Sequence, residues 1–258
     1  MLVNVRVHDH VGTIELNRPD KRNALSRALI ADISQAFFDL HQERRVRAVI
    51  LTGAGPAFCA GMDLGEMASA SRQPDPHARW HEDSLIYRDL LEQMLQFPKP
   101  IVAAVNGPAM AGGAGLVLAS DIVVAADSAQ FGLPEPKRGV VAGMVSPLLT
   151  FRIGGGWGAY LLLSAQAIHA PQAERLGLFH ELVPAADLLP RAEALARTCA
   201  ESAPEALQLT KRMLNETIGE HLHTLLSAGA AVSATARTTE AAAEGLAAFL
   251  EKRPPVWK

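Results

Sequence analysis

The sequence predicts an α/β fold with a largely parallel sheet, followed by a helical C-terminal region. Three short apolar runs are rich in β-branched residues: VRAVILTG at 46–53, PIVAAV at 100–105 and DIVVAA at 121–126. Such runs are typical of strands that are covered on both faces. Helical patterns separate them, as βαβ crossovers require. After about Gly154, patterns rich in Ala, Leu and Glu continue to the C-terminus. We therefore place a core at 1–195 and a helical region at 196–258.

The N-terminal segment predicts a β-hairpin and then a helix. The alternating runs VNVRV at 3–7 and TIELN at 13–17 flank HDHVG, which indicates two strands joined by a turn. Ser26 is a predicted N-cap, because its side chain can accept a hydrogen bond from the first helical turn. The apolar residues that share one face of the predicted helix are Leu29, Ile33, Phe37 and Leu40.

The connections are predicted from their composition. Residues 68–83 are polar and unpatterned, so we expect a mobile loop that leads into a helix ending near the FPKP run at 97–100. LFHELV at 178–183 predicts one later strand. GGGWG at 154–158 follows no strand and indicates a joint between two helices. Further helix boundaries are expected at SAPEA (202–206) and near Gly219.

Composition excludes several classes of protein. The 258 residues are 49% hydrophobic and 20% charged, with a formal net charge of -3, so we expect a large core and no general affinity for nucleic acid. The two cysteines, Cys59 and Cys199, form no disulfide framework, which is typical of a reducing compartment. The N-terminus alternates like a strand and does not resemble a secretory signal. We therefore expect a cytoplasmic protein.

No membrane span is expected. The longest apolar region runs from Pro100 to Ala126, but Asn106, Pro108 and Asp121 interrupt it. A metal site is not expected either, because the pairs His8/His10 and His221/His223 lack neighbouring acids or cysteines at ligand spacings.

Two loops of small residues follow predicted buried strands: FCAGMDL at 58–64 and NGPAMAGGAG at 106–115. A loop of this kind leaves backbone N–H groups free at a helix start, where the helix dipole favours negative charge. A Walker-type phosphate loop is excluded, because Gly113 and Ala114 stand where Lys and Ser/Thr are required. The register also differs from that of a dinucleotide fingerprint. Tight helix–sheet packing is the alternative explanation for one such loop alone.

Long ordered blocks of the sequence resemble the crotonase superfamily, the enoyl-CoA hydratase/isomerase family. These blocks cover nearly the whole chain: LNRPDKRNALS at 16–26, ILTGAGPAFCAGMDLGEM at 50–67, the run 100–135 that ends in FGLPE, AERLGLFHELV at 173–183 and EGLAAFLEKRPPVW at 244–257. The resemblance implies a crotonase-type spiral of repeated ββα turns with a C-terminal helical trimerisation region. It also implies an acyl-CoA thioester as substrate, and a homotrimer or a dimer of trimers.

The resemblance assigns a role to the two loops. It implies that the backbone N–H groups of Met62 and Gly112 bind the thioester oxygen as an enolate forms. Preorganised donors strengthen as charge develops on that oxygen, and each contributes roughly 3 kcal/mol. Gly at position 112 also permits close approach of the ligand. Cys59, beside the first loop, is expected to pack inward rather than to act as a nucleophile.

The resemblance places a single acid/base at Glu135 in FGLPE. A carboxyl group in an apolar pocket has a raised pKa and can both accept and release a proton. The second carboxylate of two-acid hydratases matches Gly115, so that acid is missing. The Asp of dienoyl-CoA isomerases and some dehalogenases matches Gly143, so that acid is missing too. Ala111 replaces the first Gly of the usual triplet. One carboxylate suffices to move a double bond. The pattern is similar to Δ3,Δ2-enoyl-CoA isomerases, and also to hydroxycinnamoyl-CoA hydratase-lyases, which keep one Glu.

The resemblance further implies a binding site for coenzyme A, which enters as part of the substrate; no other cofactor is expected. Arg22 or Lys21 would meet its phosphates. Phe249 and Lys252 match positions that in relatives reach the coenzyme A of a neighbouring subunit, and their i,i+3 spacing predicts a shared helical face. The remaining residues assigned to substrate or coenzyme A are Ala60, Asp63, Leu64 and Gly113. Enoyl-CoA hydratase or isomerase activity is the expected function; the alternative of another class is a non-catalytic protein that binds CoA thioesters.

Overall fold

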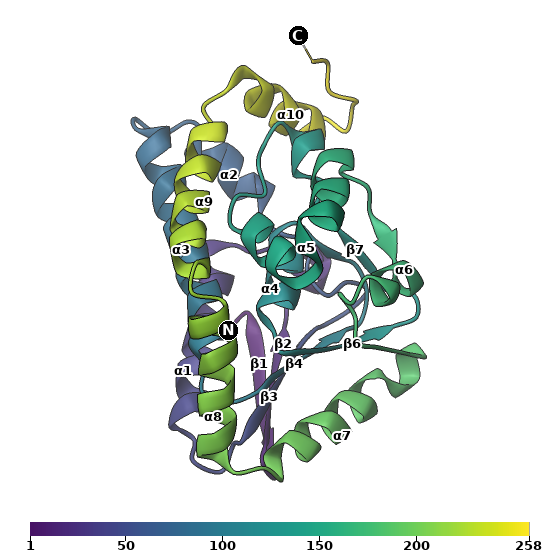
Figure 1. The fold of residues 1–258 in the computed structure, drawn as a ribbon. Helices are drawn as coiled ribbons and strands as arrows, with labels where there is room; N and C mark the ends of the chain where they lie inside the picture. Colours follow the sequence, from purple (N-terminus) through teal and green to yellow (C-terminus); the bar gives the residue numbers. More distant parts are fainter. Residues whose placement is uncertain (258) are drawn as a thin grey trace.

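A computed structural model of the chain describes residues 1–257. Its larger sheet has the strand order β1-β2-β3-β4-β6-β9 (Figure 1). The hairpin pairs β1 with β2 antiparallel, and every later neighbour in the sheet is parallel. The strands are β1 (Val3–His8), β2 (Val11–Leu16), β3 (Ala48–Gly53), β4 (Ile101–Val105), β6 (Ile122–Ala126) and β9 (Glu181–Val183). The predicted hairpin and the predicted parallel sheet are both confirmed.

A second, small sheet gives the fold its repeated turns. It contains β5 (Ala109–Met110), β7 (Gln130–Gly132) and β8 (Ile168–His169). Twice the chain passes from the large sheet to the small sheet and then into a helix: β4 is followed by β5 and α4 (Gly112–Ala119), and β6 by β7, the 3₁₀ turn η2 (Glu135–Arg138) and α5 (Val145–Ser164). An isolated bridge between Cys59 and Ala109 joins the loop after β3 to the same sheet edge.

Helices cover both faces of the large sheet (Figure 1). The main core lies on the face covered by α1 (Arg27–Gln42) and α3 (Pro76–Gln96), and Val49 and Leu51 of β3 contribute to it. The alternate residues Ala48 and Ile50 face the opposite side, where α7 (Leu188–Ala200) packs. Burial of both faces explains why β3 reads as a continuous apolar run.

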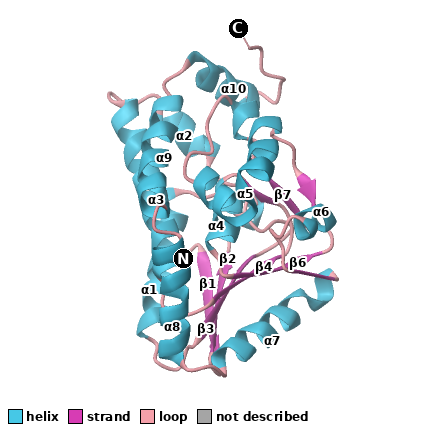
Figure 2. Cartoon of the chain, in the orientation of Figure 1, coloured by secondary structure: helices cyan, strands magenta, loops and turns pink. Residues whose placement is uncertain are grey.

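The described chain after β9 is helical (Figure 2). It contains α8 (Pro204–Arg212), a π-helical turn (Met213–Ile218), α9 (Leu222–Ala236) and α10 (Glu240–Leu250). The expected boundaries near SAPEA and Gly219 are confirmed. The expected division at 195/196 falls inside α7. α9 runs alongside α3, and α10 packs against η2 (Figure 1). This second contact is close, because a Cβ on Gly245 would lie 2.2 Å from the carbonyl oxygen of Arg138.

The predicted start of α1 is confirmed, since the Ser26 side chain accepts a hydrogen bond from the backbone N–H of Leu29. The predicted joint at GGGWG is also present: Gly154 has φ 77°, ψ 164°, and this interrupts the helical geometry inside α5. Shorter elements complete the chain: η1 (Pro19–Lys21), α6 (Ala170–Arg175) and η3 (Ala185–Asp187).

The expectation of a long loop over 68–83 is wrong. Two helices occupy most of that range, α2 (Leu64–Ala70) and α3, which begins at Pro76. Capping side chains set both starts: Asp63 accepts hydrogen bonds from Gly65 N–H and Glu66 N–H, and Asp75 accepts one from Ala78 N–H. The polar composition concealed these caps, because the same residue types favour both caps and loops.

Within residues 1–257, none of the helices combines the length and the apolar character needed to cross a bilayer.

Candidate active site

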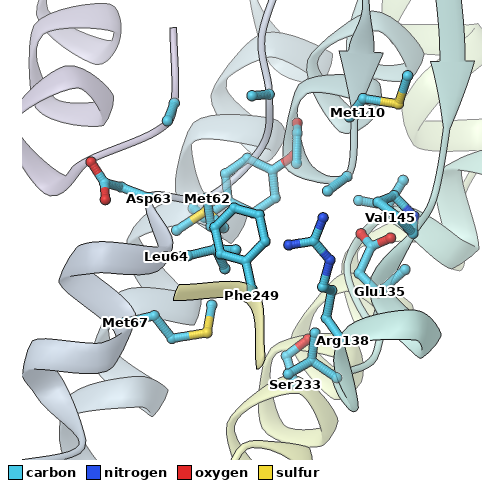
Figure 3. Close-up of a pocket in the computed structure, with 18 of the residues that line it drawn as sticks. Met62, Asp63, Leu64, Met67, Met110, Glu135, Arg138, Val145, Ser233 and Phe249 are labelled. Carbon is cyan, nitrogen blue, oxygen red and sulfur yellow. The ribbon is translucent and has the colours of Figure 1, made fainter. Parts of the chain in front are cut away.

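A cavity of about 790 Å³ lies where the two small-residue loops meet η2, α9 and α10. Its wall includes Met62 from the first loop and Glu135 from η2 (Figure 3), and also Gly112 from the second loop. Three segments far apart in sequence therefore converge, as the resemblance implied.

The two loops touch through their backbones. Cys59 N–H donates to Pro108 C=O (3.2 Å), and Met110 N–H donates to Cys59 C=O (2.9 Å). Gly61 has φ 90°, and a Cβ there would lie 3.1 Å from the nitrogen of Gly112 and 2.6 Å from Cβ of Ala111. Only glycine tolerates both this conformation and this close approach.

The backbone N–H groups of Met62 and Gly112 are unengaged. Among the described residues 1–257, neither N–H donates a hydrogen bond to a protein acceptor. Met62 pairs with Leu25 only through the neighbouring peptide groups: Leu25 N–H donates to Gly61 C=O, and Asp63 N–H donates to Leu25 C=O. Gly112 opens α4, where no intrahelical acceptor exists for its N–H. Two donors at the cavity wall are thus available to a ligand.

Ala111 introduces backbone strain directly before Gly112. Its φ of 52° with ψ −122° lies in a region that favours glycine, and holding an alanine there costs about 1–3 kcal/mol. The hydrogen bond from Ala111 N–H to Gly132 C=O (2.8 Å) helps to hold this conformation. Strain of this kind persists where the surrounding structure fixes the backbone, which is common at functional sites.

Asn23 braces the first loop, and the sequence analysis missed it. Its fully buried side-chain amide donates to the carbonyl groups of Ala54 (3.0 Å), Ala57 (2.9 Å) and Phe58 (3.2 Å). Its Oδ1 atom accepts a hydrogen bond from Arg18 N–H (2.8 Å). One sequence signal could have found it: Asn23 follows a Pro-containing turn. Asn is favoured at such a position because it tolerates the left-handed φ of 55° found here.

Glu135 is a buried carboxyl group that faces the cavity (Figure 3). Only 9% of the residue is exposed, and its Oε2 atom has no hydrogen-bond partner within the described chain. Burial raises the pKa of Glu135 to about 7, against the lowering effects of a backbone hydrogen bond and of the Arg138 charge. The group is therefore divided between its acid and its base form near neutral pH.

Tyr87 of α3 is a second functional candidate that the sequence analysis missed. Its buried hydroxyl lines the cavity and donates to Gly112 C=O (2.5 Å). A Cβ on Gly115 would lie only 2.1 Å from this hydroxyl oxygen. Tyr87 therefore occupies the space into which a side chain at residue 115 would extend. Burial raises the pKa of Tyr87 well above its usual value, so the phenol stays protonated.

The position of Gly143 also excludes a side chain. A Cβ there would lie 2.2 Å from the carbonyl oxygen of Gly229 on α9. Helix α9 thus packs where a carboxylate at 143 would begin, and Glu135 remains the buried carboxyl group of the cavity wall.

Five of the remaining predicted residues line the cavity. Lys21 and Arg22 are exposed and, with Ala60 and Leu64, line the cavity. Asp63 also lines it, but its carboxylate caps α2 and forms an ion pair with Arg18 (3.1 Å).

Two predicted positions, Gly113 and Lys252, do not line the cavity. Cys59 packs inward, as expected. Gly113 packs against the first loop, where a Cβ would lie 2.2 Å from Cys59 C=O. Cys59 is fully buried, which raises its pKa to about 12. Phe249 lines the cavity, but the expected helical face shared with Lys252 is wrong: α10 ends at Leu250, and Lys252 has a left-handed φ of 56°.

Comparisons with known proteins identify the family. The family model for enoyl-CoA hydratase/isomerase matches residues 6–258. The chain belongs to the enoyl-CoA hydratase/isomerase family. A Thermus thermophilus relative that carries a provisional enoyl-CoA hydratase name is 41% identical over 95% of this chain and 96% of its own. A 2,3-dehydroadipyl-CoA hydratase of Escherichia coli (strain K12) is 33% identical over 95% of this chain and 94% of its own.

Solved structures show the same fold. The crystal structure of an enoyl-CoA hydratase from Mycobacterium avium superposes with a TM-score of 0.88 at 30% sequence identity, over all of this chain and 99% of that one. The expected crotonase-type fold is thereby confirmed. The chain is an acyl-CoA enzyme of the enoyl-CoA hydratase/isomerase type.

The buried carboxyl group makes stability depend on pH. Because the folded-state pKa of Glu135 is about 7 rather than the usual 4.5, the folded state keeps a proton that the unfolded state releases between these values. The free energy of unfolding should therefore fall as the pH rises through this window, by up to about 3 kcal/mol from this group. Urea unfolding at pH 5 and pH 8 should show this loss in the wild type and its absence in Glu135→Gln. Equal losses in both proteins would contradict the assignment.

The contact between Tyr87 and Gly115 predicts a non-additive pair of substitutions. Tyr87→Phe should cost about 1 kcal/mol through its lost hydrogen bond. Gly115→Ala should cost at least about 2 kcal/mol, because its Cβ collides with a fixed hydroxyl. In the Tyr87→Phe background the alanine should cost about 1–2 kcal/mol less. Denaturant unfolding of the four proteins measures this coupling, and additive effects would show that the hydroxyl does not fill the space.

Proposed function

We propose that the chain moves a proton at C2 of an enoyl-CoA thioester through an enolate, with Glu135 as the single acid/base. The Met62 and Gly112 N–H groups are proposed as the oxyanion hole. The observation that carries this proposal is the convergence on one cavity of a buried carboxyl group with an unpartnered Oε2 atom and two unengaged backbone donors.

The backbone donors supply the electrostatic stabilisation. Loss of a proton from C2 moves negative charge onto the thioester oxygen, and two N–H groups directed at that oxygen stabilise the transition state more than the ground state. The N-terminus of α4 adds the positive end of its dipole at Gly112. The bracing by Asn23 and the crossing at Gly61 keep this arrangement fixed, so that little reorganisation accompanies the reaction.

Glu135 carries the proton. With a pKa of about 7, its ionised form accepts a proton from C2, and the resulting acid returns the proton to the substrate. In the isomerase reaction the carboxylate removes a proton from C2 of a 3-enoyl thioester. The electron pair shifts to give a dienolate, and the carboxyl group then protonates C4 to give the 2-enoyl product.

Isomerisation is favoured over hydration by the acids that line the cavity. Besides Glu135 they are Asp20, which is exposed, and Asp63, which is bound by Arg18. One buried carboxyl group suffices for a proton shift between C2 and C4. Water addition is easier when two acids hold the water between them.

Hydration is the second candidate, because several relatives bear hydratase names. This candidate includes a reaction of the hydroxycinnamoyl-CoA hydratase-lyase type, which involves hydration and also uses a single Glu. A chain that binds CoA thioesters without turnover is the alternative of another class.

The same proposal covers the rest of the site. The exposed side chains of Lys21 and Arg22 would bind the phosphates of coenzyme A. The chemistry requires no metal or redox cofactor, since only a proton moves. We also propose a homotrimer or a dimer of trimers. The exposed apolar side chains of Ile218, Leu225 and Val232 near and along α9 support such an assembly.

Glu135→Gln is expected to lower kcat by about 10³-fold, because it removes the proton carrier and little volume. The dissociation constant for a CoA thioester should change by less than about threefold, since the backbone donors remain. Steady-state kinetics and calorimetry measure the two quantities. Glu201→Gln, at an exposed carboxyl group, is the matched control. Undiminished turnover in Glu135→Gln would defeat the proposal.

Incubation with 2-enoyl-CoA and 3-enoyl-CoA in deuterated water distinguishes the candidates. Isomerase activity predicts conversion of the 3-enoyl to the 2-enoyl thioester with deuterium at C2 or C4. A 3-hydroxyacyl product would instead establish hydration. Binding with neither outcome would establish the non-catalytic alternative. Mass spectrometry of the thioesters gives the readout.

A further inference from the structure

We propose that Arg138 binds a carboxylate on the acyl group, so that the cavity selects acyl-CoA thioesters whose acyl chain ends in a negative charge. This inference rests on the proposed function, which places the thioester at Met62 and Gly112 and the reacting carbon at Glu135.

Arg138 and Glu135 belong to the same short turn. They are the last and first residues of η2, and side chains three residues apart in a 3₁₀ turn project from the same face. Figure 3 shows the guanidinium group of Arg138 directed into the cavity, between the ring of Phe249 and the carboxyl group of Glu135. A substrate whose reacting carbon meets Glu135 therefore has Arg138 close to its acyl chain.

The Arg138 side chain has no carboxylate at ion-pair distance among the described residues, and Glu135 acts on it only through its nearby charge. Within residues 1–257 it forms no ion pair and no hydrogen bond, and its guanidinium group lies over the ring of Phe249, with 4.0 Å between the guanidinium carbon and the ring centroid. Two other arginines, Arg27 and Arg191, behave differently. Arg27 binds Asp83 through two hydrogen bonds (2.6 and 2.8 Å), and Arg191 binds Glu181 in the same manner (2.6 and 2.7 Å).

A second arginine adds positive charge to the same wall. Arg237, at the end of α9, lines the cavity and is 9% exposed. It donates to Trp80 C=O (3.3 Å), while the nearby acid Asp83 is already bound by Arg27. Burial lowers the pKa of Arg237 to about 10, so it remains charged at neutral pH. The wall thus carries two guanidinium groups, neither of them in an ion pair within the described residues.

The position of Arg138 separates it from the coenzyme A phosphates. Lys21 and Arg22 are exposed, as expected for residues that bind a solvated pyrophosphate. Arg138 is half-buried beside the acid/base, and burial lowers its pKa against the raising effect of Glu135. An anion at Arg138 is therefore assigned to the acyl chain. The alternative, that Arg138 binds a phosphate of coenzyme A, is one of the outcomes that the test distinguishes.

Charge selection here follows from desolvation. The folded protein has already removed part of the water around Arg138, so a carboxylate ligand gains a planar, two-point partner at reduced cost. A neutral acyl chain would displace the remaining water and leave the guanidinium charge without a partner. The stack on Phe249 orients the guanidinium plane toward the cavity.

The test compares three ligands by isothermal titration calorimetry: adipoyl-CoA, hexanoyl-CoA and free coenzyme A. The two thioesters have the same chain length and differ in the terminal carboxylate, and neither contains a double bond that can be hydrated or moved. Wild-type protein should bind adipoyl-CoA about tenfold more tightly than hexanoyl-CoA. Arg138→Met should abolish that preference and leave the affinity for free coenzyme A unchanged.

Two further variants serve as controls. Lys137→Met removes an exposed charge from the same turn and should keep the preference. Phe249→Leu removes the stacked ring and should reduce the preference without eliminating it, because the charge remains.

Several results would overturn the inference. Equal binding of adipoyl-CoA and hexanoyl-CoA by the wild type would refute it. Equal weakening of all three ligands in Arg138→Met would assign Arg138 to the phosphates. Loss of the preference in Lys137→Met would indicate a general charge effect. Because these measurements need no turnover, they are separate from the Glu135→Gln assay: a clear preference together with an active Glu135→Gln variant would defeat the proposed mechanism alone.

Discussion

The crossing of two backbone segments at Gly61 and Gly112 is the constraint on which the site depends. The approach is possible because Gly61 has no Cβ and adopts a φ that other residues avoid. The paired hydrogen bonds between Cys59 and the second loop hold the crossing in place. The crossing brings both unengaged N–H groups to one wall, although fifty residues separate them along the chain.

Two partly or fully buried charged groups, Glu135 and Arg138, determine the electrostatics of the cavity wall. Glu135 and Arg138 share one 3₁₀ turn. Burial raises the pKa of Glu135 and lowers the pKa of Arg138, because it disfavours the charged form of each group. The fold tolerates this because the two groups are near enough to offset each other. The surrounding side chains, such as Tyr87, Met62 and Val145, are mostly apolar and limit the access of water.

The sequence alone was sufficient for the parallel sheet, because strands buried on both faces carry an apolar signal that a short window records. It also located Glu135 and the two loops through their ordered blocks. It was not sufficient for Tyr87 or Asn23, whose side chains donate hydrogen bonds to carbonyl groups 25 or more residues away. The start of α3 was missed for a local reason: Asp75 and Pro76 read equally well as a loop and as a cap followed by the first helical residue. The mutual placement of Arg138 and Phe249 depends on how α10 packs on η2, which no local pattern records.

The seating of α10 on η2 has a consequence for biosynthesis. The cavity wall draws on residues from Asp20 near one end of the chain to Leu250 near the other. A nascent chain therefore cannot complete this cavity wall until α10 has emerged from the ribosome and packed on η2. Truncated products that lack α10 would leave the cavity open on that side, so that enclosure of a ligand depends on synthesis of the chain through Leu250.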